Sequence, residues 1–92
     1  MEKRLEEILH ITQEECAEVT QAISKVFRFG FAGSHNGKSN KQSLEEEIGD
    51  LECMLELLKL EFAIDREQVE LAKLRKATKL NTWSTHIRTE VV

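Results

Sequence analysis

The sequence predicts an all-α fold, a helical bundle formed by one domain over residues 1–92. Proline is absent from the 92 residues, and β-branched residues rarely alternate with polar ones. Apolar residues instead recur at intervals of three and four, the spacing of an amphipathic helix. A chain of this length forms only a small core. We therefore expect the bundle to be completed by oligomerisation, as a homodimer or a homotetramer.

The first helix is expected over residues 4–29, with Gly30 ending it. Its apolar stripe consists of Leu5, Ile8, Thr12, Val19, Ile23 and Val26. A helix of about 25 residues is about 38 Å long, whereas a compact domain of 100 residues has a radius of gyration of about 13 Å. One subunit can hardly cover that stripe, so we expect a partner subunit to cover part of it.

Residues 30–42 are rich in glycine, serine and asparagine, which predicts a flexible loop. A second helix is expected over 43–62, because Ser43 followed by Glu46 matches a capping box. Its apolar residues are Leu44, Ile48, Leu51, Leu55, Leu58 and Phe62. Asp65 followed by Gln68 predicts the cap of a third helix over 65–80.

Composition and charge exclude several classes of function. The net charge of -4 argues against a general surface for duplex nucleic acid. Cys16 and Cys53 are far apart and form no Cys-x-x-Cys pair, which indicates reduced thiols rather than a zinc site or a disulfide framework. The first residues carry charges where a signal peptide needs an apolar run, and no segment is long enough for a membrane span. We expect a soluble cytoplasmic protein with no membrane partner.

Two acidic clusters are the most informative features of the chain. One contains Glu14, Glu15 and Glu18, and the other contains Glu47 and Asp50. Such clusters are usually solvated helix faces. At about 100° per residue, however, Glu47 and Asp50 fall within the apolar arc of their helix. Because an unpaired buried carboxylate is costly, these two groups need a compensating cation or hydrogen-bond donors.

On the first helix the same geometry places Glu15 at the edge of the apolar stripe, with Glu18 beside it and Glu14 farther out. Neither helix carries an equivalent inward lysine or arginine. Four carboxylates from two packed helices would suit a hard divalent cation, Mg²⁺ or Mn²⁺. The sequence therefore predicts a metal site formed by Glu15, Glu18, Glu47 and Asp50.

The acidic pattern and its surroundings resemble those of the MazG-type nucleotide pyrophosphohydrolases, which belong to the all-α NTP pyrophosphatase superfamily. The resemblance extends over about residues 5 to 80 and is closest to compact single-domain members, many of them encoded by phages. It is carried by Glu-Glu-x-x-Glu followed by Glu-x-x-Asp, and by the segments Glu-Glu-Cys-Ala-Glu-Val, Ala-Ile-Ser-Lys-Val-Phe-Arg-Phe-Gly and Leu-Glu-Glu-Glu-Ile-Gly-Asp.

The resemblance implies a Mg²⁺-dependent hydrolase that converts an NTP or dNTP to the monophosphate and pyrophosphate. Glu15, Glu18, Glu47 and Asp50 would bind metal, and Glu14 would bind a further ion or orient a water. The expected contacts to the substrate phosphates are Lys25, Arg28 and Lys76. Larger relatives often carry an asparagine shortly after the lysine of the third helix, but Ala77 stands in the nearest position here.

Two alternatives remain open at the level of sequence. A phosphoribosyl-ATP pyrophosphohydrolase of histidine biosynthesis shares the fold and the metal chemistry, although the context of Glu47 to Asp50 looks less like it. The chain could also be a catalytically silent helical module that keeps the fold for oligomerisation. Retention of all the acidic positions argues against the silent module.

Overall fold

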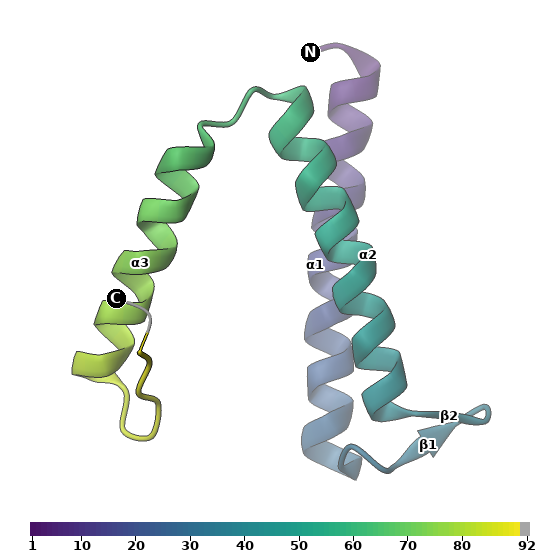
Figure 1. The fold of residues 1–92 in the computed structure, drawn as a ribbon. Helices are drawn as coiled ribbons and strands as arrows, with labels where there is room; N and C mark the ends of the chain where they lie inside the picture. Colours follow the sequence, from purple (N-terminus) through teal and green to yellow (C-terminus); the bar gives the residue numbers. More distant parts are fainter. Residues whose placement is uncertain (91–92) are drawn as a thin grey trace.

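An antiparallel pair of long helices forms the centre of the computed structural model, which describes residues 1–90 (Figure 1). The last two residues of the expected domain, 91–92, lie outside the described part. In chain order the elements are α1 (Lys3–Phe29), β1 (Ser34–His35), β2 (Lys38–Ser39), α2 (Asn40–Glu61) and α3 (Arg66–Trp83). The structure confirms the all-α fold class, with one small two-stranded sheet added to it.

α1 and α2 pack along their apolar stripes. Ile8 and Ala22 are 4% and 5% exposed, and Thr12 between them is 7% exposed. The Thr12 hydroxyl donates to the carbonyl oxygen of Ile8 at 2.7 Å, which satisfies this buried polar group within its own helix. No described side chain is completely buried, so the core of a single chain is thin.

The expected flexible loop over 30–42 instead contains a short β-hairpin over residues 34–39, and its last three residues belong to α2. Its strands pair antiparallel, with Ser34 opposite Ser39 and His35 opposite Lys38. Asn36 and Gly37 form the turn with φ of 54° and 78°. Two successive residues with positive φ match the right-handed twist of the strands, and the Asn-Gly dipeptide favours this conformation.

The hairpin leads directly into α2, which begins at Asn40 instead of near Ser43. The expected capping box at Ser43 was wrong. Ser39 is the cap, since its hydroxyl accepts from the Gln42 N–H at 3.1 Å and the Gln42 side chain accepts from the Ser39 N–H at 2.9 Å. Ser39 and Gln42 have the same spacing as the expected pair Ser43 and Glu46, but lie one helical turn earlier in the chain. Ser39 is also the last residue of β2, so its backbone is extended, as a capping residue requires.

Asn40 fixes the hairpin to the end of α1. Asn40 is 5% exposed. Its side-chain amide donates to the Gly30 carbonyl oxygen at 3.0 Å, and its backbone N–H donates to the Gly33 carbonyl oxygen at 2.7 Å. Gly33 lies so close to α1 that a Cβ atom there would be 2.6 Å from the Phe29 carbonyl oxygen. The crossing from α1 to α2 therefore requires glycine at this position.

α2 ends at a tight joint with α3. The Ile64 N–H donates to the Lys59 carbonyl oxygen at 3.0 Å, and Ala63 between the helices has φ of 49°. This is a Schellman ending, in which the left-handed residue is usually glycine. Asp65 then caps α3 as expected, accepting from the N–H groups of Glu67 and Gln68 at 3.0 and 3.3 Å.

α3 diverges from α2 after the joint and packs closely against neither α1 nor α2 within residues 1–90 (Figure 1). The Cα trace measures 40 × 38 × 15 Å and has a radius of gyration of 16.2 Å. A compact chain of this length has a radius of gyration of about 12 Å. Within the described residues, none of the helices is both long and apolar enough to cross a bilayer.

We predict that Ala63→Gly stabilises the protein. The left-handed backbone at φ 49° costs an alanine about 1–2 kcal/mol more than a glycine, and the larger unfolded-state entropy of glycine offsets about half of this. Thermal unfolding at fixed protein concentration should show a gain of about 1 kcal/mol and a rise in Tm of about 4–8 °C. The matched control is Ala72→Gly in the interior of α3, which should lose about 1 kcal/mol; a loss in both variants would contradict the prediction.

A candidate metal centre between the first two helices

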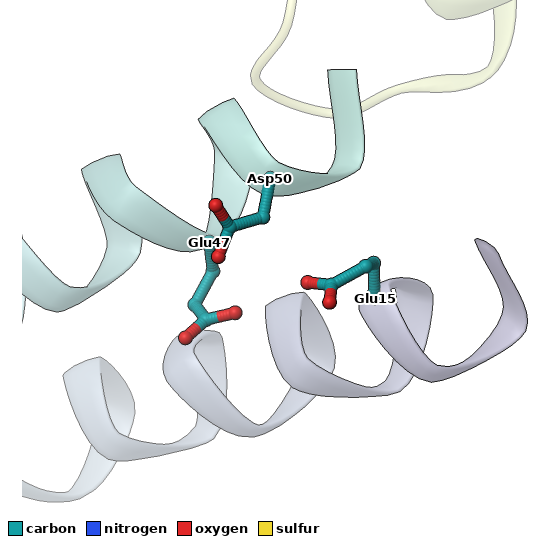
Figure 2. A group of neighbouring side chains, drawn as sticks. All are labelled: Glu15, Glu47 and Asp50. Carbon is teal, nitrogen blue, oxygen red and sulfur yellow. The ribbon is translucent and has the colours of Figure 1, made fainter. Parts of the chain in front are cut away.

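Three carboxylates converge where α1 and α2 pack together. Glu15 comes from α1, and Glu47 and Asp50 come from α2, with one oxygen of each lying within 4.8 Å of the others. Figure 2 shows the three side chains pointing toward one another from the two helices. The structure thus brings together three of the four residues expected to bind metal, and they do not project separately into solvent.

The position of this cluster follows from helical geometry. Glu47 and Asp50 are three residues apart and occupy one face of α2. That face is part of the apolar arc that contacts α1, so Glu47 is only half-exposed, as is Glu15 on the opposing helix. The outward carboxylates of α2, such as Glu45 and Glu52, remain exposed.

The cluster carries negative charge that no basic side chain neutralises. Among residues 1–90, no lysine or arginine forms an ion pair with Glu15, Glu47 or Asp50. Burial raises the pKa of Glu47, and the negative charges of Glu18, Asp50 and Glu15 raise it further. The Oε2 atom of Glu15 is buried and has no hydrogen-bond partner. A buried, unsatisfied carboxylate oxygen beside two further carboxylates is the pattern that a bound cation would stabilise.

The donor set fits Mg²⁺ or Mn²⁺. Both ions prefer carboxylate oxygens, whereas the cluster offers no imidazole or thiolate of the kind that zinc and copper favour. Oxygens bound to one Mg²⁺ ion at about 2.1 Å lie about 3.0 Å apart at adjacent positions and about 4.2 Å apart at opposite positions. The separations here are at most 4.8 Å, so the side chains would have to move inward to bind one ion.

Glu18, the fourth expected ligand, lies next to this group but outside it. It lines a cavity of about 100 Å³ together with Glu47, Lys25, Gln21, Ala22 and Ser43. Its side chain is exposed, and its charge contributes to the raised pKa of Glu47. Glu18 therefore lines the same cavity as Glu47, but its carboxylate does not belong to the group of three.

Lys25 connects this opening to a larger basic cavity. The larger cavity has a volume of about 440 Å³ and is lined by Lys25, Arg28, Phe29, Ser34, His35 and Asn40. The Arg28 guanidinium lies over the Phe29 ring, 5.0 Å from its centroid, which restrains the arginine at the cavity. No acidic residue lines this cavity, so it is suited to an anion.

Lys25 and Arg28, which the sequence predicts as phosphate contacts, line this cavity, and so do Ser34 and His35, which the sequence did not single out as site residues. The signal that could have found them is the Asn36-Gly37 dipeptide. It predicts a hairpin turn, and a hairpin at this point folds residues 34 and 35 back toward the end of α1.

Two of the expected site residues lie elsewhere in this chain. Glu14 is exposed and lines a shallow surface pocket with Lys3, Glu6, Glu7, His10 and Ile11, away from the three clustered carboxylates. Lys76 is exposed on α3, which does not pack against α1 or α2 within the described residues. Neither residue takes part in the acidic cluster or lines the basic cavity.

We predict that Glu47→Gln stabilises the metal-free protein at pH 7.5. Because the folded-state pKa of Glu47 is raised, its ionisation destabilises the fold as the pH rises from about 4.5 through that pKa, and the loss persists above it. Glutamine does not ionise, so the substitution removes this destabilisation. It should also abolish the rise in Tm that Mg²⁺ causes in the wild type. Thermal melts with and without Mg²⁺ measure both effects.

The matched control is Glu52→Gln on the exposed face of the same helix. It should leave the pH dependence and the response to Mg²⁺ unchanged. A wild-type Tm that does not respond to Mg²⁺ or Mn²⁺, or an equal response in the two variants, would be incompatible with a metal site at Glu47.

Comparison with known proteins agrees with this geometry. The model of the MazG nucleotide pyrophosphohydrolase domain family matches residues 3–80, well over half of the chain. The matched segment contains both acidic clusters and both cavities. No curated protein and no solved structure matches the chain. The chain belongs to the MazG nucleotide pyrophosphohydrolase domain family.

Proposed function

We propose that the protein is a Mg²⁺-dependent nucleoside triphosphate pyrophosphohydrolase, which cleaves an NTP or dNTP into the monophosphate and pyrophosphate. The observation that supports this most directly is the unpartnered, buried oxygen of Glu15 within a group of three carboxylates that lacks a basic partner. Membership of the MazG family supports nucleotide pyrophosphohydrolase activity in general. In the cell we place the reaction in the cytoplasm, as housecleaning of the nucleotide pool.

In this proposal Glu15, Glu47 and Asp50 bind the divalent ion, and Glu18 completes the set when its exposed side chain turns inward. Bound Mg²⁺ or Mn²⁺ would neutralise the phosphate oxygens and lower the pKa of a coordinated water. A carboxylate of this cluster would accept the proton of the attacking water. Glu14 acts from a greater distance, by orienting water or holding a further ion.

The phosphates that leave as pyrophosphate would lie along the basic side of the site. Lys25 lines both the small cavity beside Glu18 and Glu47 and the larger cavity beside Arg28. A triphosphate with its α-phosphate at the carboxylates would therefore extend its β- and γ-phosphates toward Lys25 and Arg28. Lys76 stays a predicted substrate contact, and it would have to reach the site from another subunit or after a movement of α3.

The decisive test is a screen for pyrophosphate release over the common ribo- and deoxyribonucleoside triphosphates with Mg²⁺. At least one substrate should yield equal amounts of monophosphate and pyrophosphate. Glu47→Gln should lower kcat/KM by about a hundredfold or more, because it removes a charged ligand of the ion. Glu52→Gln, which is exposed on the same helix, should retain wild-type activity.

The same screen separates the alternatives. Release of orthophosphate instead of pyrophosphate would contradict the proposed bond cleavage. With phosphoribosyl-ATP added to the screen, activity confined to that compound would assign the protein to histidine biosynthesis. If every substrate remains intact, and neither Mg²⁺ nor a non-hydrolysable nucleotide raises the Tm, the protein is a silent helical module.

We predict separate kinetic effects for the two basic residues at the larger cavity. Lys25→Met and Arg28→Met should each lower kcat/KM by about tenfold or more, because each removes a charge-assisted hydrogen bond to phosphate. The Tm increase caused by Mg²⁺ alone should remain. Lys73→Met is the control, since Lys73 pairs with Glu70 on α3 at 3.2 Å, away from both cavities. Equal losses in all three variants would indicate a general effect of charge rather than a phosphate subsite.

A further inference from the structure

Side chains of α1 and α2 face each other in one antiparallel register along the flank of the helix pair that contains the acidic cluster. On each helix these side chains are separated by alternating intervals of three and four residues, which keeps them on one face. The pairs in order from the start of α1 are Arg4 with Glu61, Ile8 with Leu57, Ile11 with Met54, Glu15 with Asp50, and Glu18 with Glu47. The carboxylates therefore continue a row whose preceding members are apolar.

An apolar cavity lies in this row, on the side of the carboxylates that is nearer to the start of α1. The cavity has a volume of about 350 Å³ and is lined by Arg4, Glu7, Ile8, Ile11, Met54 and Leu57. Ile8 is 4% exposed, and the other three apolar residues are half-buried. The ion pair between Arg4 and Glu61 joins the two helices at the far end. A mostly apolar recess with a few polar groups at its edge is typical of a ligand site.

The apolar cavity is within reach of a nucleotide whose α-phosphate lies at the carboxylates. At about 1.5 Å per residue, Ile11 precedes Glu15 by about 6 Å along α1. Met54 follows Asp50 by the same distance along α2. In a nucleotide only the ribose separates the base from the α-phosphate, so the base of such a nucleotide reaches the cavity.

The basic cavity lies on the other side of the carboxylates, because Lys25 is about 15 Å beyond Glu15 along α1. The flank is therefore ordered as apolar cavity, carboxylates and basic cavity. A nucleoside triphosphate has the same order of base, α-phosphate and terminal phosphates. The opposite flank of the helix pair also exposes apolar side chains, among them Ile48 (41%) and Leu55 (38%). That flank lacks the three clustered carboxylates, so it offers no position for the α-phosphate.

We propose that the apolar cavity binds the base of the nucleoside triphosphate substrate, with Ile11 and Met54 nearest the sugar. This subsite rests on the proposed pyrophosphohydrolase function, which places the α-phosphate at the carboxylates. Three aliphatic side chains and one thioether supply no donor and only a weak acceptor for the edge of a base. They contact the face of the base and its apolar substituents instead. The protein therefore selects substrates by the apolar area of the base more than by its hydrogen-bonding groups.

A comparison of dTTP with dUTP tests this selectivity, because the two substrates differ only in one methyl group on the base. A methyl group held in an apolar pocket changes kcat/KM by about tenfold or more, so dTTP should be the better substrate by about tenfold. Met54→Gln keeps the length of the side chain but makes it polar. It should bring the ratio of the two kcat/KM values close to one, mainly through KM, and leave the Tm increase caused by Mg²⁺ alone unchanged.

The matched control is Leu60→Gln, because Leu60 is 70% exposed on the same helix and does not line the apolar cavity. This control should keep the wild-type preference for dTTP. A wild type that hydrolyses dTTP and dUTP equally well would overturn the proposal. An unchanged preference in Met54→Gln would overturn it too.

A footprint of the wild type separates the subsite from catalysis and needs no substitution. The chain contains two methionines, Met54 in the cavity and Met1, which is 78% exposed. Dilute peroxide converts methionine to the sulfoxide, and peptide mass spectrometry measures the reaction at each position. With Mg²⁺ and a saturating non-hydrolysable dTTP analogue, oxidation of Met54 should slow at least threefold while that of Met1 stays unchanged. Inorganic tripolyphosphate with Mg²⁺ has no base and should not protect Met54.

Equal protection of Met54 by the analogue and by tripolyphosphate would overturn the base subsite, as would no protection by the analogue. Protection that rises with protein concentration in the absence of nucleotide would also overturn it, because a second chain would then cover the cavity. Protection by the analogue without hydrolysis of any triphosphate would support the subsite and contradict the proposed function. The two proposals therefore fail in distinguishable ways.

Discussion

The chemistry of the site depends on the electrostatic repulsion among the carboxylates of Glu15, Glu47 and Asp50. Two long helices pack through a thin apolar stripe, and beside it lie the half-exposed Glu15 and Glu47 and the exposed Asp50. Within residues 1–90, no lysine or arginine forms an ion pair with these three carboxylates. The cost is visible in the raised pKa of Glu47 and in the unpartnered oxygen of Glu15. Such an arrangement stores electrostatic strain that a divalent cation would relieve, and it couples the stability of the fold to the chemistry of the site.

Helical periodicity predicted the fold class and the convergence of Glu15 with Glu47 and Asp50, because one angle per residue decides which side chains face a partner helix. It could not place Lys76, since that position depends on the direction of α3 after the joint at Ala63 and not on the pattern within α3. The start of α2 was misplaced because Ser39 and Ser43 both match the cap pattern with a residue three positions later. Only the hairpin, whose strand geometry extends the backbone at Ser39, decides between them.

The two flanks of the α1–α2 pair differ in chemical character. One flank carries Glu18 and Lys25 beside the carboxylates, and the other carries the apolar side chains left uncovered by the single chain. Because the acidic groups lie in the contact between the helices, both flanks depend on the same packing distance.

Hydrogen bonds and an ion pair join the hairpin between α1 and α2 to the start of α2. Ser39 caps the helix, Asn40 ties it to the end of α1, and Lys38 pairs with Glu46 at 2.7 Å across the first two turns. His35, on the paired strand, is thereby joined to the helix that carries Glu47. A displacement of the hairpin would therefore act, through the Ser39 cap and the Asn40 hydrogen bond, on the first turns of the helix that carries Glu47 and Asp50.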